Sequence, residues 1–349
     1  MPNKLSSSTK SSMITRIITS IVFVAVVVPC SILGGWFFFV LGLFLAMVAT
    51  HEILQVPGEG KYSWLIRIMT FVYVLLFLLS FFIKPWATGL DPFKLDMSAF
   101  TLTPMTFLIP LALTLIYFFA MFLIAIFSEK IKLEDVTFLV CMETFVALGF
   151  TGLFFLRYFP NATGTAHETS FFVSSLGKQN VWTSSALVLT IAISTWSSDV
   201  GAYFAGVLFG KHPMIPRISP HKTWEGFVGG CVFSYIVYFG LVCLYEFAFN
   251  IPLIPGLLQM KTSSLLTGMH VLGGASWVFV VSIGLLLPVV GNIGGYLFSL
   301  IKRHYAIKDY GKIFPGHGGV IDRFDSVLAN SVSTALLLML MSYGFNMIG

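Results

Sequence analysis

The densest group of polar residues lies between positions 299 and 325. Asp322 and Asp325 stand three residues apart and would share one face of a helix. Lys302 and Arg303 precede them, and the intervening turn is rich in glycine, whose backbone amides can approach an anion closely. Hard cations such as Mg²⁺ are held by one or two carboxylates together with the substrate's own phosphates. This combination predicts phosphoryl or nucleotidyl transfer.

Two shorter polar segments precede this one. Asp199 lies well inside an apolar run, where an unpaired carboxylate is costly and a Lys, an Arg or a metal ion is expected as its partner. Further along, Lys222 follows Ser219 and precedes Thr223, and either hydroxyl could cap the next helix. A helix N-terminus beside a lysine is a typical phosphate site, although a plain cap and a membrane-orienting lysine give the same pattern.

Composition determines which elements must hold these segments. Of the 349 residues, 57% are hydrophobic and 10% are charged, whereas a soluble domain has about 25% charged residues. A helix crosses the hydrocarbon core in about 20 residues. We therefore predict an all-α polytopic membrane protein with about nine transmembrane helices. The apolar runs are 14–31, 33–51, 64–84, 103–128, 136–157, 183–209, 225–249, 274–301 and 325–347.

The distribution of basic residues predicts the orientation of these helices. Fifteen of the 20 Lys and Arg residues fall in the N-terminal tail and in alternate loops, which the positive-inside rule places in the cytoplasm. The N-terminus is then cytoplasmic and the C-terminus lies on the far side. Segment 250–273 is broken by prolines and is interpreted as interfacial or re-entrant. If it crossed the membrane instead, the C-terminus would lie on the cytoplasmic side. We divide the chain into a cytoplasmic tail (1–13), an N-terminal transmembrane bundle (14–180) and a catalytic transmembrane region (181–349).

The cysteines, the net charge and two further carboxylates narrow the range of possible functions. The four cysteines show no CxxC or Cys/His spacing, which argues against a zinc site and a disulfide framework. The net charge of +5 is spread between apolar runs, so no nucleic-acid partner is expected. Glu52 and Glu143 lie in or beside predicted spans. Such carboxylates are candidates for function, although one at a helix end can simply reach the interface.

The segment SLIKRHYAIKDYGKIFPGHGGVIDRFD at 299–325 resembles the signature of the phosphatidate cytidylyltransferases, also called CDP-diacylglycerol synthases. The segments DVGAYFAGVLFGK and SPHKTWEG, within 199–230, resemble a second conserved region of that family, and the resemblance covers about 185–330. Many bacterial members carry an Asp four residues before the signature serine as a second metal carboxylate. This chain has Gly295 there, a pattern closer to that of eukaryotic members.

The resemblance implies transfer of CMP from CTP to the phosphate of phosphatidate, with release of pyrophosphate, in phospholipid biosynthesis. The implied cofactor is Mg²⁺, with room for a second, monovalent or divalent, cation. The implied partners are CTP, phosphatidate and membrane lipid, and a homodimer is left open. The short N-terminal tail favours a bacterial plasma membrane, with the endoplasmic reticulum membrane as the alternative, and the active site is expected in the cytoplasm.

Residue roles follow from the resemblance together with the residue types. Mg²⁺ is assigned to Asp322, with Asp199 or Asp325 completing its ligands. For His317, a structural role in the glycine turn is an equal alternative. The catalytic candidates are Asp322, Asp325, Arg323, His317, Lys308 and Asp309, and the candidates for binding substrate phosphates are Ser219, Lys222, Thr223, Ser299, Lys302, Arg303, Gly318 and Gly319.

Two other functions are open on the sequence alone. A CTP-dependent polyprenol or phytol kinase would share the spans and CTP, but it would release CDP instead of pyrophosphate. A membrane transporter would have internal repeats and polar groups near the middle of the membrane. We find no repeat, and the polar segments gather at one face, which disfavours a transporter.

Overall fold

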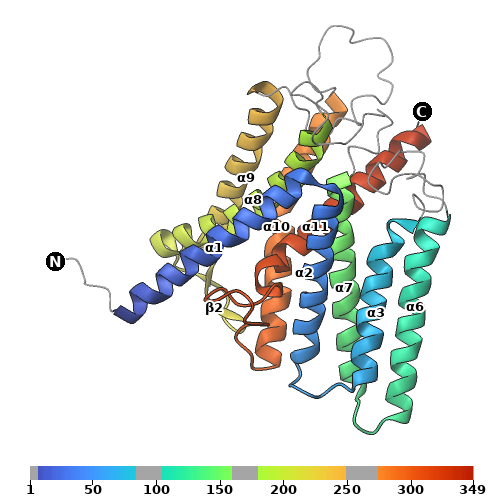
Figure 1. Ribbon diagram of the computed structural model, residues 1–349. Helices are drawn as coiled ribbons and strands as arrows, with labels where there is room; N and C mark the ends of the chain where they lie inside the picture. The colour runs from blue at the N-terminus through green and yellow to red at the C-terminus, as the bar shows by residue number, and fades with distance from the viewer. Residues whose placement is uncertain (1–6, 84–103, 159–179, 249–273, 349) are drawn as a thin grey trace.

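The computed structural model describes residues 7–83, 104–158, 180–248 and 274–348, and most of them are helical (Figure 1). Each predicted span overlaps one α-helix, and five described helices are long and apolar enough to cross a membrane. The prediction of an all-α polytopic membrane protein is confirmed, whereas 250–273 lies outside the described residues. The helices are α1 (Ser7–Leu33), α2 (Gly35–Gln55), α3 (Trp64–Ser80), α6 (Pro104–Phe127), α7 (Leu133–Tyr158), α8 (Asn180–Phe209), α9 (Trp224–Cys243) with a π-helical turn (Leu244–Ala248), α10 (Gly274–His304) and α11 (Ile321–Ile348).

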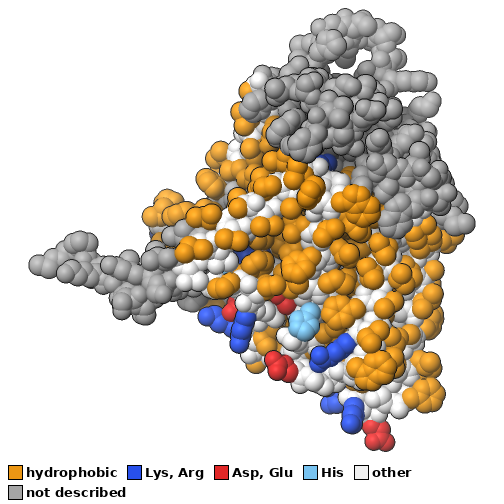
Figure 2. Space-filling model, viewed as in Figure 1, with side chains coloured by type: hydrophobic (Ala, Val, Ile, Leu, Met, Phe, Trp, Pro, Cys, Tyr) orange, Lys and Arg blue, Asp and Glu red, His pale blue; other side chains and the backbone are white. Residues whose placement is uncertain are grey.

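Charged side chains gather at one end of the helical bundle. The loops 56–63, 128–132 and 305–320 join α2 to α3, α6 to α7 and α10 to α11 at this end (Figure 1). Figure 2 shows most of the charged side chains of this face along the same end, while hydrophobic side chains predominate over the rest of the described part of this face. Such a separation suits a protein whose middle lies in lipid.

A short hairpin interrupts the helical pattern between α8 and α9. β1 (Pro213–Ile215) and β2 (Ser219–Thr223) pair antiparallel, and the sequence analysis did not predict them. Strands of this length are too short to produce a clear alternating pattern. The Glu225 carboxylate accepts hydrogen bonds from the N–H groups of Lys211 and His212 at 3.1 and 3.2 Å, which ties the start of the hairpin to α9.

The close contact of α8 and α9 depends on small residues. A Cβ at Gly226 would lie 2.9 Å from the carbonyl oxygen of Ala202, and one at Gly230 would lie 2.7 Å from that of Ser198. Glycine permits such an approach of helix backbones in a membrane. The contact brings α8 beside the start of α9, where the hairpin ends.

Polar bonds join α8 to the other helices of the C-terminal half. The Ser234 hydroxyl of α9 donates to the carbonyl oxygen of Ser194 at 2.9 Å. The Asn330 amide of α11 donates to the Thr195 hydroxyl at 2.7 Å. Because such groups lack water as an alternative partner in lipid, these bonds fix how α8 faces its neighbours.

The N-terminal helices α2, α3, α6 and α7 contact the C-terminal half mainly where α7 packs against α11. A Cβ at Gly152 would lie 2.9 Å from the carbonyl carbon of Ser331, so the two helices approach closely. The Ser331 hydroxyl donates to the carbonyl oxygen of Gly149 at 2.7 Å. The helix that carries Asp322 and Asp325 is therefore held by both halves of the chain.

Arg157, near the end of α7, caps α1. Its buried guanidinium donates to the carbonyl oxygens of Ser31 and Ile32 at 2.7 and 3.1 Å. The last carbonyl groups of a helix have no partner within it, and a cation there is favourable. Arg157→Met would leave both carbonyls unpaired, so we expect the free energy of unfolding to fall by about 1 to 3 kcal/mol.

Thermal unfolding in detergent measures this change. The exposed Arg217→Met variant serves as the control, because it removes an arginine from the hairpin region without removing a cap. Equal melting temperatures for the two variants would contradict the capping role of Arg157.

Candidate active site

The C-terminal end of α10 reverses the chain and leads it to α11. Ala306 has a positive φ of 53° and donates its N–H to the carbonyl oxygen of Arg303 at 3.3 Å. The N–H of Ile307 donates to the carbonyl oxygen of Lys302 at 3.0 Å. This Schellman arrangement satisfies the last carbonyl groups of α10. It places Lys302 in the final turn, next to the loop 305–320.

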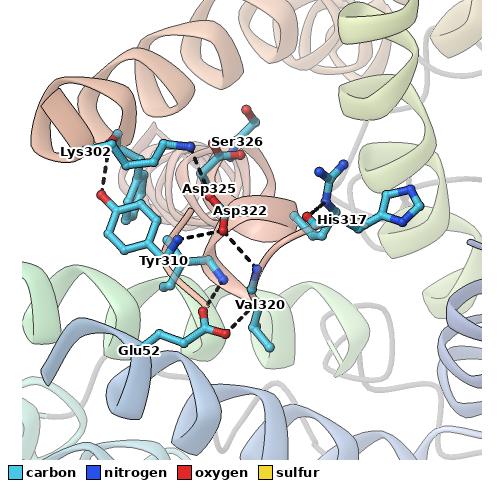
Figure 3. Close-up of polar contacts among 12 residues, drawn as sticks. Glu52, Lys302, Tyr310, His317, Val320, Asp322, Asp325 and Ser326 are labelled. Atoms are coloured by element: carbon cyan, nitrogen blue, oxygen red, sulfur yellow. Dashed lines mark hydrogen bonds and ion pairs between the residues drawn. The ribbon is translucent and has the colours of Figure 1, made fainter. Parts of the chain in front are cut away.

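Asp322, in the first turn of α11, is the centre of the polar contacts in Figure 3. Its Oδ1 accepts from the Lys302 Nζ at 3.0 Å, and its Oδ2 accepts from the N–H groups of Tyr310 and Gly319 at 2.8 and 2.9 Å. The Asp322 side chain is only 4% exposed, so these charge-assisted bonds lie largely away from water. Asp322 therefore links α10, the loop and α11, and both of its oxygens have protein partners.

The glycine turn leaves room for this carboxylate. Gly318 has a φ of 86°, a conformation that favours glycine, and a Cβ there would lie 2.6 Å from the Asp322 Oδ2. The N–H of Gly319 is already bound by Asp322. The glycines thus permit a carboxylate to approach the backbone, and their predicted role in binding substrate phosphate stays a prediction.

Glu52 of α2 contacts the same turn. Its carboxylate is buried and accepts the N–H groups of Val320 and Ile321 at 2.8 and 2.9 Å (Figure 3). The sequence marked Glu52 only as a carboxylate at the end of a span, because its partners lie 268 and 269 residues away. Glu143, the other carboxylate marked in this way, is buried in α7 and accepts a hydrogen bond from Thr50 at 3.0 Å.

A cavity of about 230 Å³ lies between α8, the end of the hairpin, the start of α9 and α10. Its lining includes Asp199 from α8, Lys222 from β2, and Asn292 and Tyr296 from α10. The Lys222 Nζ lies 4.3 Å from the centroid of the Tyr296 ring, a cation–π distance. The cavity therefore presents a carboxylate and an ammonium group to anything that enters it.

Electrostatic effects connect Lys222 with three further charged groups. Burial lowers the pKa of the Lys222 ammonium, the carboxylates of Asp199 and Asp325 act to raise it, and Lys302 acts to lower it. A cation therefore lies near Asp199, as expected, although the two groups line the same cavity without forming an ion pair. We call Asp199, Lys222, Lys302 and Asp325 the charged cluster; its members come from α8, β2, α10 and α11.

Gly295 borders the charged cluster. A Cβ at this position would lie 3.8 Å from the Asp325 Oδ2 and 3.1 Å from the Ser326 Oγ. The acidic side chain that the resemblance implies for many bacterial members would begin next to the Ser326 hydroxyl and the Asp325 carboxylate. Asn292, one turn earlier, lines the cavity, and its amide donates to the carbonyl oxygen of Pro288 at 2.7 Å.

The hairpin residues have distinct local roles. Thr223 is the N-cap of α9 and accepts the N–H of Gly226 at 3.1 Å, which confirms the cap predicted at one of two hydroxyls. Ser219 instead pairs with Ile215 in the hairpin. Arg303 does not bind Asp322, the partner of Lys302. Its Nε donates to the carbonyl oxygen of Ile218 at 3.0 Å and so fixes the hairpin against the end of α10.

The remaining predicted residues surround the turn. The His317 Nε2 lies 3.2 Å from the Ser20 hydroxyl of α1, and the carbonyl oxygen of His317 accepts from the Arg323 Nε at 2.9 Å. Two of the predicted catalytic residues therefore contact each other. Lys308 and Asp309 are exposed in the loop, and Ser299 is half-buried on α10.

The profile of a family described as the cytidylyltransferase family matches residues 14–341. The chain belongs to this family. A phosphatidate cytidylyltransferase of Mycobacterium bovis is 36% identical over 157 residues, which is 45% of this chain and 42% of the relative. Enzymes of the same name from Staphylococcus saprophyticus and Staphylococcus aureus are 28% and 26% identical over 313 residues, which is 90% of this chain and 94% of each relative.

The family predicted from two segments is thus confirmed over nearly the whole chain. The chain spans about two fifths of the mycobacterial relative and almost all of each staphylococcal one. The part that matches the cytidylyltransferase profile includes the N-terminal bundle as well as the charged cluster. Glu52 of α2, which binds the turn before α11, therefore lies inside the matched region.

Proposed function

We propose that the protein is a phosphatidate cytidylyltransferase, which transfers CMP from CTP to phosphatidate and releases pyrophosphate. The observation that carries the proposal is the cavity lined by Asp199 and Lys222, with Asp325 and Lys302 close enough to act on the Lys222 ammonium. Membership of the cytidylyltransferase family and the names of the relatives support the same reaction.

The reaction demands control of charge more than a strong base. An anionic oxygen of the phosphatidate phosphate attacks the α-phosphorus of CTP, and a new P–O bond forms. The bond from the α-phosphorus to the oxygen that bridges it to the β-phosphorus breaks, and pyrophosphate leaves with that electron pair. Because two polyanions must meet, positioning and cationic groups supply most of the catalysis. Lys222 and Lys302 would offset this charge, with Arg323 beside the turn.

The two carboxylates of the charged cluster fit a Mg²⁺ ion that arrives with the nucleotide. Within the described ranges, no hydrogen bond or ion pair engages the Asp199 carboxylate, and Asp325 Oδ2 faces Gly295. The described residues contain no group of three or more His, Cys, Asp or Glu that could hold a metal alone. Mg²⁺ is usually held by one or two carboxylates plus substrate phosphates, so this pair is sufficient.

We therefore assign Mg²⁺ to Asp199 and Asp325. The bound ion would neutralise the phosphates of CTP. Asp322 is a less suitable ligand, because Lys302 and two backbone N–H groups already engage both of its oxygens.

Purified protein in lipid micelles tests the reaction directly. With CTP labelled in the cytidine ring, phosphatidate and Mg²⁺, we expect lipid-soluble label and an equal amount of pyrophosphate. Release of CDP in place of pyrophosphate would indicate the lipid kinase. If no CTP is consumed, the proposed reaction is wrong.

Removal of divalent metal should abolish turnover. Dialysis against a chelator is expected to reduce formation of the lipid product to background, and added Mg²⁺ is expected to restore it, because the CTP phosphates need a counter-charge beside the two carboxylates. The melting temperature, measured in parallel, separates loss of metal from loss of fold. Undiminished turnover in the chelator contradicts the metal assignment.

We propose that the charged end faces the cytoplasm and that the membrane is a bacterial plasma membrane, because CTP is cytoplasmic and the relatives named above are bacterial. A cysteine at the exposed position Lys312, introduced after replacement of the native cysteines, should react with an impermeant maleimide only in opened cells. Labelling in intact cells would reverse the orientation. The endoplasmic reticulum alternative and the homodimer stay predictions.

A further inference from the structure

We propose that Glu52 is a positioning residue for the reaction proposed above. It lies in α2, outside the charged cluster, and fixes the turn that carries Asp322. This inference rests on the proposed function, because its kinetic test measures the proposed reaction. It also gives the N-terminal bundle a direct part in building the active site.

The first argument is the way α11 begins. The first N–H groups of a helix lack partners within it, and Ser, Thr, Asp or Asn usually caps them. Here the chain enters α11 through Gly318, Gly319 and Val320, none of which has a side chain that can accept a hydrogen bond. The Glu52 carboxylate supplies the missing cap by accepting the N–H groups of Val320 and Ile321. A negative charge at this end also suits the helix dipole.

The second argument is the close fit of the backbone around this carboxylate. A Cβ at Gly311 or at Gly319 would collide with Glu52 Oε1. The loop after α10 and the turn before α11 thus both pack directly against one side chain of α2. Glu52 is 4% exposed, so its hydrogen bonds face little competition from water.

The third argument is the connection to the charged groups of the site. Three consecutive N–H groups are divided between two carboxylates: Gly319 donates to Asp322, whereas Val320 and Ile321 donate to Glu52. In Figure 3, Asp322 lies between Lys302 and Glu52. If Glu52 no longer held its two amides, they would be available to Asp322. That carboxylate could then shift, and Lys302 would shift with it.

Glutamine at position 52 tests this arrangement with little change of shape. In the carboxylate each oxygen accepts one of the two N–H groups, whereas glutamine puts an N–H₂ group in place of one oxygen, so one backbone N–H would face a donor. We expect Glu52→Gln to lower kcat by about 10- to 100-fold, the usual cost of losing a group that orients a catalytic side chain. The KM for CTP should stay close to that of the parent, because Glu52 lies outside the charged cluster. The matched control is Glu59→Gln, an exposed glutamate in the loop after α2.

Hydrogen exchange provides a second measurement that does not depend on turnover. Exchange of the amides in 318–322 should accelerate in Glu52→Gln, while that of α8 and α9 stays as in the parent. Glu52→Asp serves if the glutamine variant does not fold, since it keeps the charge but is shorter by one methylene. It is likewise expected to lose kcat.

The outcomes separate the two proposals. An inactive parent enzyme refutes the proposed function, and the positioning role falls with it. An active parent together with a folded Glu52→Gln or Glu52→Asp variant of unchanged kcat overturns the positioning role alone. Lower kcat with unchanged KM for CTP and faster exchange confined to the turn supports it.

Discussion

Asp199→Asn and Asp325→Asn should each lower the rate of CDP-diacylglycerol formation by about 100- to 1,000-fold, the range found when one preorganised electrostatic group is removed. The two carboxylates come from different helices and both act on the Lys222 ammonium, and we propose them as the pair that best fits a Mg²⁺ ion bound with CTP. Asparagine keeps the size of each side chain and removes the charge. The measurement is the initial rate with labelled CTP across a range of Mg²⁺ concentrations.

The Mg²⁺ dependence distinguishes a metal ligand from a residue that supports the fold. Both variants should need more Mg²⁺ for half-maximal rate, whereas Glu134→Gln, an exposed carboxylate at the start of α7, should behave as the parent. Asp322→Asn is the informative comparison. If it shifts the Mg²⁺ dependence while Asp199→Asn and Asp325→Asn leave it unchanged, the ligand pair is wrong and Asp322 holds the ion.

Lys302→Met should lower both stability and turnover. The Lys302 ammonium and the Asp322 carboxylate lie 3.0 Å apart with side chains 18% and 4% exposed, and loss of one partner leaves a nearly buried charge unpaired. The expected cost is about 3 kcal/mol, at the lower end for buried pairs because Lys302 is not fully enclosed. Thermal unfolding and the labelled-CTP assay measure the two effects.

The pair formed by Lys61 and Asp135 provides a matched control. Its charged atoms lie 3.1 Å apart with side chains 32% and 9% exposed, at the entrance to α3 and α7. Lys61→Met should reduce stability and leave turnover per folded molecule unchanged. The double variant Lys302→Met with Asp322→Asn should recover part of the stability but not the activity. Full activity in Lys302→Met would exclude a role for this lysine in the reaction.

Several features of this protein follow from its sequence alone. The low charge content and the length of the apolar runs predicted a helical membrane protein, since the hydrocarbon core demands internally bonded segments of a fixed length. The Thr223 cap was predictable because the bond to Gly226 spans three residues. A cation near Asp199 was predictable as a class, because a carboxylate in an apolar run is costly without one, but the sequence could not select Lys222, which lines the same cavity.

Other features were decided by the tertiary structure. Lys302 and Arg303 are adjacent in the chain, yet one binds Asp322 and the other fixes the hairpin, because their side chains leave α10 in different directions. The glycines of the signature predicted close approach of an anion, and in the structure the anions are the carboxylates of Asp322 and Glu52. Which anion fills such a turn depends on the surrounding helices.

Glu52 shows most clearly what could not be predicted from the sequence. Its residue type and its position at the end of a span were visible, but the amides it binds lie 268 and 269 residues further along the chain. Local rules of length, hydropathy and capping act over a few residues, so they predict helices and caps within one segment. Contacts between α2 and α11 depend on the packing of α7 between the two halves, which only the folded chain determines.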